Sequence, residues 1–95
     1  NEVVKDSSSI AYKDNVQPLD SDSNRVFDLN PVTFNWKRNG SPDFGLIAED
    51  VAEAMPEMVT YNKDGEPQAV RYDRLSVFLL LELAKIKTKL EVALP

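Results

Sequence analysis

The sequence predicts a small α+β domain that ends in a long helix. Two observations lead to this prediction. Short β-type runs, rich in β-branched and aromatic residues, lie between positions 32 and 72 and are separated by turns containing Gly, Asn and Asp. Residues 73–94 contain neither Gly nor Pro. The chain has 95 residues, 42% of them hydrophobic, which suits one small folded domain of marginal stability.

Polar residues dominate positions 1–20, which we expect to form a loop or an extended arm. Ser21 or Asp22 is expected to cap a short helix that runs to Leu29, before Pro31. Residues 32–36 then alternate as a half-buried strand, which places Val32, Phe34 and Trp36 on one face and the two aromatic side chains in the core. Residues 37–43, with Gly40 and Pro42, are expected to form the following turn.

Residues 46–55 have the spacing of an amphipathic helix, with Ile47, Val51 and Ala54 on one stripe and acidic residues opposite, and Pro56 ends it. Two β-type runs follow, at 58–61 and 68–72. The Asp64-Gly65 pair between them predicts an antiparallel β-hairpin.

The last segment, 73–94, is expected to form a long helix that Asp73 can cap. Its first two turns are apolar nearly all round, which requires burial on more than one side. Beyond them a 4-3-4-3 spacing indicates the seam of a parallel coiled coil, and Leu at a with Ile at d favours three or four strands. Glu82 and Lys87 take positions suited to an interchain ion pair. The alternative is that the stripe packs against its own domain. The seam residues are Leu79, Leu83, Ile86, Leu90 and Ala93.

Charge and composition exclude several function classes. The net charge of −5 disfavours nucleic acid as a partner, because such binding depends on clustered Lys and Arg. The absence of Cys and His excludes disulfides, thiolate catalysis, His triads and most zinc sites. The acidic residues Glu49, Asp50 and Glu53 suit the solvated face of a helix better than a metal site. The longest apolar run, 77–81, cannot span a membrane. We expect no cofactor, metal or small-molecule substrate.

Four segments stand out, in this order: SSIAYKDNV at 8–16, LNPVTFNW at 29–36, GLIAEDVAEAMPEMV at 45–59, and residues 70–90. Together they resemble the self-cleaving chaperone of endosialidase family, the C-terminal intramolecular chaperone of phage tail spikes and fibres. The resemblance implies a homotrimer that registers an upstream fibre or spike segment of the same chain. It also implies a phage virion tail precursor assembled in the host cytoplasm. Residues 1–7 would then end the upstream fibre or linker, and 8–95 would form the chaperone domain.

The family's cleaving pair is a Ser followed five residues later by a Lys, which falls here on Ser8 and Lys13. The tail of the motif is matched by 14–16, whereas Ser9 replaces the usual Asp and Ile10-Ala11 occupies positions where Arg is common. The resemblance therefore implies a single-turnover serine endopeptidase that cuts the bond between Ser7 and Ser8. Three alternatives remain: a Ser-rich linker with a solvated lysine, a fibre trimerisation domain that is not cleaved, and the related domain of the membrane-tethered myelin regulatory factor transcription factors.

A Ser–Lys pair sets two physical requirements. A lysine acts as a general base only where burial or nearby positive charge lowers its pKa from about 10.4 towards neutrality. Trimer formation could remove water from Lys13 and so couple cutting to assembly. An extended chain would also separate Ser8 and Lys13 by roughly 16 Å. The segment must therefore bend, or the pair must form between neighbouring chains.

Overall fold

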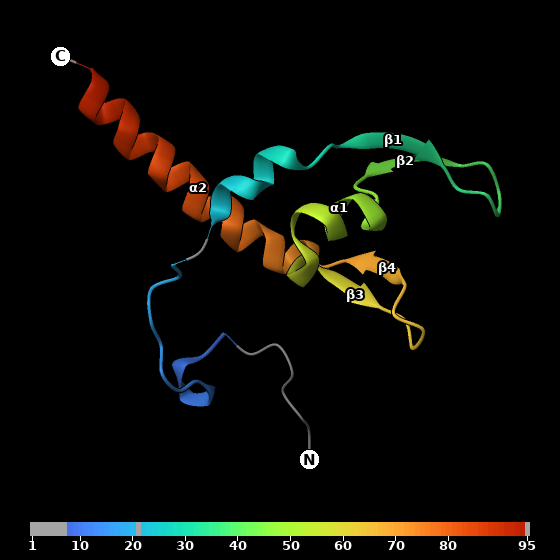
Figure 1. Ribbon diagram of the computed structural model, residues 1–95, viewed down its shortest axis with the longest axis horizontal. Helices are drawn as coiled ribbons and strands as arrows, with labels where there is room; N and C mark the ends of the chain where they lie inside the picture. The colour runs from blue at the N-terminus through green and yellow to red at the C-terminus, as the bar shows by residue number, and fades with distance from the viewer. Residues whose placement is uncertain (1–7, 21, 95) are drawn as a thin grey trace.

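A computed structural model describes residues 8–20 and 22–94, and it confirms the α+β class, with two antiparallel hairpins and a long C-terminal helix (Figure 1). In chain order the elements are the 3-10 helices η1 (Ile10–Tyr12) and η2 (Ser23–Asp28), the strands β1 (Val32–Asn35) and β2 (Pro42–Gly45), the helix α1 (Ala48–Ala54), the 3-10 helix η3 (Pro56–Met58), the strands β3 (Val59–Tyr61) and β4 (Pro67–Val70), and the helix α2 (Tyr72–Ala93).

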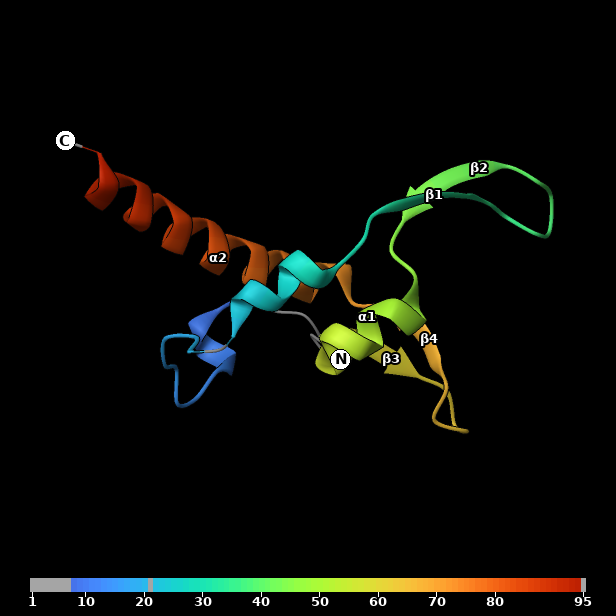
Figure 2. The same cartoon turned by 45° about the horizontal axis from the view of Figure 1, so that its top comes forward.

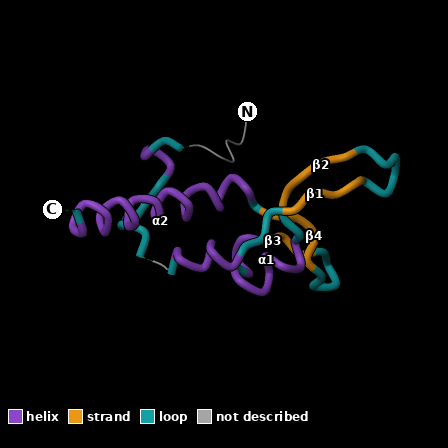
Figure 3. The backbone as a smooth tube through the Cα atoms, turned by 90° about the horizontal axis from the view of Figure 1, so that it is seen from above, coloured by secondary structure: helices purple, strands orange, loops and turns teal. Residues whose placement is uncertain are grey.

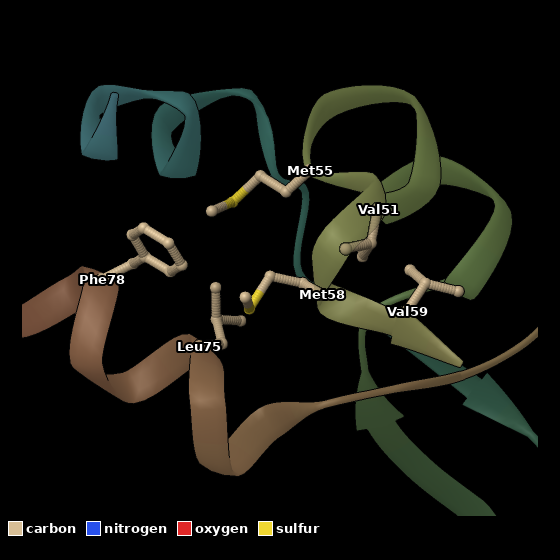
Figure 4. Close-up of a cluster of buried hydrophobic side chains, with 6 residues drawn as sticks. All are labelled: Val51, Met55, Met58, Val59, Leu75 and Phe78. Atoms are coloured by element: carbon tan, nitrogen blue, oxygen red, sulfur yellow. The ribbon is translucent and has the colours of Figure 1, made fainter. Parts of the chain in front are cut away.

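The core lies where α1, η3 and β3 meet the first turns of α2 (Figure 4). Half-buried residues of η2 and of the segment after it, Val26 and Leu29, pack against this core. Such a small core leaves much apolar surface exposed in a single chain, as expected for a domain of this length. Its buried members are Val51, Met55, Met58, Val59, Leu75 and Phe78.

The predicted hairpin after η3 is confirmed. β3 pairs with β4 in antiparallel register, from Val59 opposite Val70 to a bulge at Thr60 and Tyr61. The Asn62 carboxamide oxygen accepts hydrogen bonds from the backbone N–H groups of Asp64 and Glu66, both at 2.9 Å. The turn also needs a residue with φ of +81°, which Gly65 supplies without strain.

The other hairpin corrects the sequence prediction. The turn is shorter than 37–43, and Pro42–Gly45 forms a strand that pairs with β1, with Val32 opposite Gly45. Pro42 is tolerated because it begins a strand in a two-stranded sheet. The placement of Phe34 and Trp36 in the core was wrong: Phe34 is half-buried and Trp36 is exposed. The hairpin projects from the body, so little of the chain covers its faces (Figure 2).

Aromatic and charged contacts hold this projecting hairpin together instead. The rings of Phe34 and Trp36 meet edge to face, with centroids 5.0 Å apart, and the Arg38 guanidinium lies 4.7 Å from the centre of the Trp36 ring. The Asp43 carboxylate accepts the backbone N–H of Phe44 at 2.8 Å and the indole N–H of Trp36 at 3.1 Å. These two hydrogen bonds lower the pKa of Asp43.

The helical predictions hold in position and differ in detail. The helix expected before Leu29 is the 3-10 helix η2, and α1 begins only at Ala48 because β2 extends to Gly45. α2 begins one residue before its predicted start, so Asp73 lies inside the first turn and is not its cap. Its first turns bury Leu75 and Phe78 on one side only, in contrast to the burial on several sides that we expected.

The molecule is elongated, measuring 53 × 44 × 24 Å. The distal half of α2 extends away from the other elements, and the two hairpins project from the opposite end (Figures 1 and 3). No helix in residues 8–20 and 22–94 is both long enough and apolar enough to cross a membrane.

Candidate functional site

The segment of residues 8–20, which we call the arm, contains both residues of the predicted Ser–Lys pair. Every residue of the arm is exposed in the single chain, Ser8 and Lys13 included. In Figure 1 the arm, drawn in blue, hangs away from the hairpins and from the distal half of α2. Ser7, on the other side of the predicted scissile bond, lies outside the described residues.

A 3-10 turn brings Lys13 back to Ser8. The Ser9 hydroxyl caps η1 by accepting the backbone N–H of Ala11 at 3.0 Å, and the N–H of Lys13 donates to the carbonyl of Ile10 at 3.1 Å. The Lys13 ammonium (Nζ) then donates to the carbonyl oxygen of Ser8 at 3.2 Å. The arm of one chain is therefore bent, as an intrachain pair would require. Lys13 contacts the carbonyl oxygen of Ser8, whereas the general-base contact that the resemblance implies would be to a serine hydroxyl.

Ser9 has a structural role in this turn. It occupies the position where the family usually has Asp, and both residue types are strong caps for the start of a helical turn. Asn15, two residues beyond Lys13, adopts a left-handed backbone with φ of +53°, a conformation that Asn tolerates better than most residues. The arm therefore contains residues suited to turns both before and after Lys13.

The root of the arm is fixed to the body through η2. The Arg25 guanidinium forms a bidentate ion pair with the Glu57 carboxylate, and its Nε donates to the carbonyl of Asp22 at 2.9 Å. The hydrogen bond from Arg25 lowers the pKa of Glu57, and the carboxylate in turn raises the pKa of Arg25. Leu19 lies at the edge of a shallow hollow of about 270 Å³ that Met58 and other body residues also line.

A second polar contact joins η2 to α2, and sequence reasoning missed it. The Ser23 hydroxyl, which is fully buried, donates to Glu82 Oε1 at 2.9 Å and accepts from Lys85 Nζ at 2.9 Å. Glu82 is therefore directed into its own chain and not towards an interchain partner, while Lys87 pairs with Glu91 at 3.6 Å. The spacing of Leu75, Phe78 and Glu82 would have placed Glu82 on the core face of the helix.

The predicted seam of α2 is uncovered in the single chain. Its five residues are all exposed, and the body covers the adjoining side of the helix, where Leu75 and Phe78 are buried. The structure therefore does not adopt the alternative in which the stripe packs against its own domain. The exposed residues of the seam are Leu79, Leu83, Ile86, Leu90 and Ala93.

No group of three or more acidic side chains in residues 8–20 and 22–94 is arranged to hold a metal ion. Glu49 and Asp50 lie exposed in the first turn of α1, and Glu53 is exposed further along it. This arrangement agrees with their interpretation as the solvated face of a helix.

Two comparisons with known proteins bear on the family. No curated protein matches the chain significantly. A family model described as chaperone of endosialidase, a peptidase family, matches residues 8–60. The match starts at Ser8 and includes the bent arm, η2, the β1–β2 hairpin and α1, and it ends in β3. It spans more than half of the sequence, so the chain belongs to the chaperone of endosialidase family.

Proposed function

We propose that this domain is an intramolecular chaperone that trimerises through α2, registers an upstream phage tail fibre or spike segment, and releases itself by cutting between Ser7 and Ser8. The family supports the chaperone role and the phage tail context. One observation carries the cleavage proposal: the arm is bent so that the Lys13 ammonium lies 3.2 Å from the carbonyl oxygen of Ser8. The lysine thus lies beside the required serine within one chain, despite the five-residue spacing.

In the proposed reaction the Ser8 hydroxyl attacks the carbonyl carbon of Ser7. Lys13, as a neutral amine, takes the hydroxyl proton and then gives it to the departing amino group of Ser8. The peptide bond breaks as an ester forms between the Ser7 acyl group and Ser8 Oγ. Water hydrolyses that ester, which leaves a carboxylate on Ser7 and a free amino group on Ser8. A backbone N–H is the simplest donor for stabilising the oxyanion.

Assembly is the proposed trigger. In the single chain Lys13 is exposed, whereas a lysine acts as a general base where burial or nearby positive charge favours its neutral form. Ile10, Tyr12 and Val16 expose apolar side chains on the same arm. Packing these side chains against neighbouring chains would remove water from Lys13 and favour its neutral form, so that cutting would follow assembly without a separate signal.

The seam supports the trimeric state. An exposed stripe of three leucines, an isoleucine and an alanine on one helix face is a strong apolar surface for a domain with such a small core. Parallel packing of three such helices buries the stripe and sets the three chains in one register. That register is what an upstream trimeric fibre or spike segment needs while it folds in the host cytoplasm as part of the tail precursor.

Cleavage is tested by expressing the chain joined to a folded upstream segment and analysing it on a denaturing gel with Ser8→Ala and Lys13→Ala. The proposal expects two fragments from the parent and one full-length band from each variant. Lys63→Ala is the matched control, because Lys63 is an exposed lysine in the β3–β4 turn, and it should be cut like the parent. Full-length bands throughout would reject self-cleavage and favour a structural trimerisation domain.

A further inference from the structure

The buried contact between η2 and α2 is a three-membered polar chain. Lys85 donates to Ser23, and Ser23 donates to Glu82, with both bonds at 2.9 Å. Ser23 is 0% exposed and Glu82 is 6% exposed. These two are the only buried polar residues in the described part of the chain, and no buried side-chain nitrogen or oxygen there lacks a hydrogen-bond partner.

Burying these groups is a poor way to gain stability. A buried ionic or polar cluster is often no more stabilising than apolar residues of similar size, because the charged groups lose their hydration. Its hydrogen bonds are directional, however, and are satisfied in only one placement of the two elements. The cluster therefore fixes η2 at one height and one rotation on α2, which apolar packing alone would specify less sharply.

On the helix side, the cluster sits next to the seam. Glu82 immediately precedes Leu83, and Lys85 immediately precedes Ile86, on one continuous helix. Neighbouring residues of an α-helix are held about 100° apart by its geometry. Any rotation of α2 that aligns Leu83 and Ile86 with other chains therefore carries Glu82 and Lys85 with it, and Ser23 follows through its two hydrogen bonds.

On the other side, the cluster sits at the root of the arm. Ser23 is the first residue of η2, the element that the arm leads into. The Arg25–Glu57 ion pair holds η2 against η3. Leu19, near the end of the arm, lines the same hollow as Met58. Ser23 thus connects η2, the element that follows the arm, to the helix that carries the seam.

We propose that Ser23, held between Glu82 and Lys85, is a positioning residue that fixes η2, and with it the end of the arm, relative to α2, so that seam formation places Ser8 and Lys13 for cleavage. This inference rests on the proposed self-cleavage. Ser23 does not touch the scissile bond between Ser7 and Ser8. It acts by placing the end of each of the three arms in the same position relative to the seam.

The test separates positioning from assembly. The chain joined to its folded upstream segment is prepared as parent, Ser23→Ala and Ser76→Ala. Ser76 is the matched control, because its hydroxyl bonds to the carbonyl of Asp73 on the exposed side of α2. The first-order rate constant of cleavage is measured on denaturing gels over a series of protein concentrations, with the mass of each sample determined by sedimentation.

The proposal expects the rate constant of Ser23→Ala, measured where the variant is fully trimeric, to fall about 10- to 100-fold, since small misplacements of reacting groups have effects of this size. The concentration for half-maximal cleavage should stay unchanged, and Ser76→Ala should match the parent. Lys85→Met, which keeps an unbranched stem of similar length, replaces Ser23→Ala if that variant does not fold. It is expected to show the same fall.

Four outcomes would overturn the inference. An unchanged maximal rate with a shifted half-maximal concentration would assign Ser23 to stability and assembly alone. A product that ends at Asp22 would make Ser23 a nucleophile. A parent that stays uncut would reject the proposed self-cleavage and this inference with it, whereas a cut parent with unaffected variants would reject this inference alone.

Discussion

The body of the domain, residues 22–94, and the arm, residues 8–20, differ in how much of their structure one chain completes. The body closes a core around Met55 and Val51 and satisfies its buried polar groups. The arm folds its own turn, with Ser9 as cap and Lys13 beside Ser8, yet all of it stays exposed. The single chain thus builds a scaffold and a bent segment that carries the proposed Ser–Lys pair. In our proposal, assembly encloses that segment.

Helix α2, which belongs to the body, shows the same contrast along its own surface. Leu75 and Phe78 on one side of it pack into the body, while the adjoining stripe of predicted seam residues stays uncovered. In our proposal, the uncovered stripe serves for association. Substitutions on the two faces should therefore have different consequences, and the first two predictions test that separation.

The largest effect is expected at the seam. Leu83→Asp puts a charge in the middle of the proposed trimer interface and should abolish trimer formation in sedimentation experiments. The body should still fold, because Leu83 is 64% exposed in the single chain. Val92→Asp is the matched control: Val92 is 81% exposed, on the same helix but on the side opposite the stripe, and this variant should remain trimeric. Equal loss of the trimer in both variants would contradict the assigned seam.

The next effect is expected in the core. Met55→Ala removes a fully buried side chain and should lower the free energy of unfolding by about 2–5 kcal/mol. This is measured by urea denaturation, followed by far-UV circular dichroism. Parent and variant both carry Leu83→Asp, so that every sample is monomeric. Leu80→Ala on the same background should change the free energy by less than about 0.5 kcal/mol. If Met55→Ala lowered the free energy of unfolding by less than about 1 kcal/mol, the core described here would be contradicted.

A smaller effect is expected where η2 meets the body. Glu57→Gln removes the ion pair with Arg25 and should lower the free energy of unfolding at pH 7 by about 0.5–1 kcal/mol, a modest value because the Glu57 side chain is 43% exposed. Arg25 lowers the pKa of Glu57 in the folded state, so the pair stabilises the fold above the pKa of an unfolded glutamate, about 4.3. This contribution is lost as the pH falls through the lowered folded value.

Urea titrations of parent and Glu57→Gln at several pH values measure this dependence. The difference between the two proteins should shrink as the solution becomes more acidic than about pH 4. Glu91→Gln is the control, since Glu91 pairs with Lys87 on the exposed surface of α2, and its effect should stay below about 0.5 kcal/mol. The pKa of an unfolded glutamate is about 4.3. If the difference in free energy of unfolding between parent and Glu57→Gln stayed constant down to about pH 3, the ion pair would not be the source of that difference.

The sequence predicted an element correctly where residues close together in the chain determine it. The Asp64-Gly65 turn, the end of α1 before Pro56 and the long helix from position 73 all follow from short-range chemistry, and the structure has each. Strand β2 was missed because Pro42 and Gly45 mark turns in a sequence, and only the pairing with β1 makes them a strand. Phe34 and Trp36 were misplaced because alternation predicts a strand face without saying whether anything covers it.

The candidate site divides in the same way. The five-residue spacing of Ser8 and Lys13 required a bend, and the structure supplies it through Ser9, whose capping role the sequence analysis did not use. The contact of Ser23 with Glu82 and Lys85 joins residues about sixty positions apart, which no local pattern could pair. The helical spacing of Glu82 with Leu75 and Phe78 does identify it as a core-facing acid in need of a partner.

The central claim is that assembly completes the arm and starts cleavage, and the concentration dependence of cleavage in the parent chain tests it most directly. The half-time of cleavage, measured on denaturing gels with sedimentation of the same samples, should lengthen on dilution and reach a constant minimum where the chain is fully trimeric. Leu83→Asp should stay uncut at every concentration. Cleavage of a sedimenting monomer at a rate independent of dilution would contradict the claim.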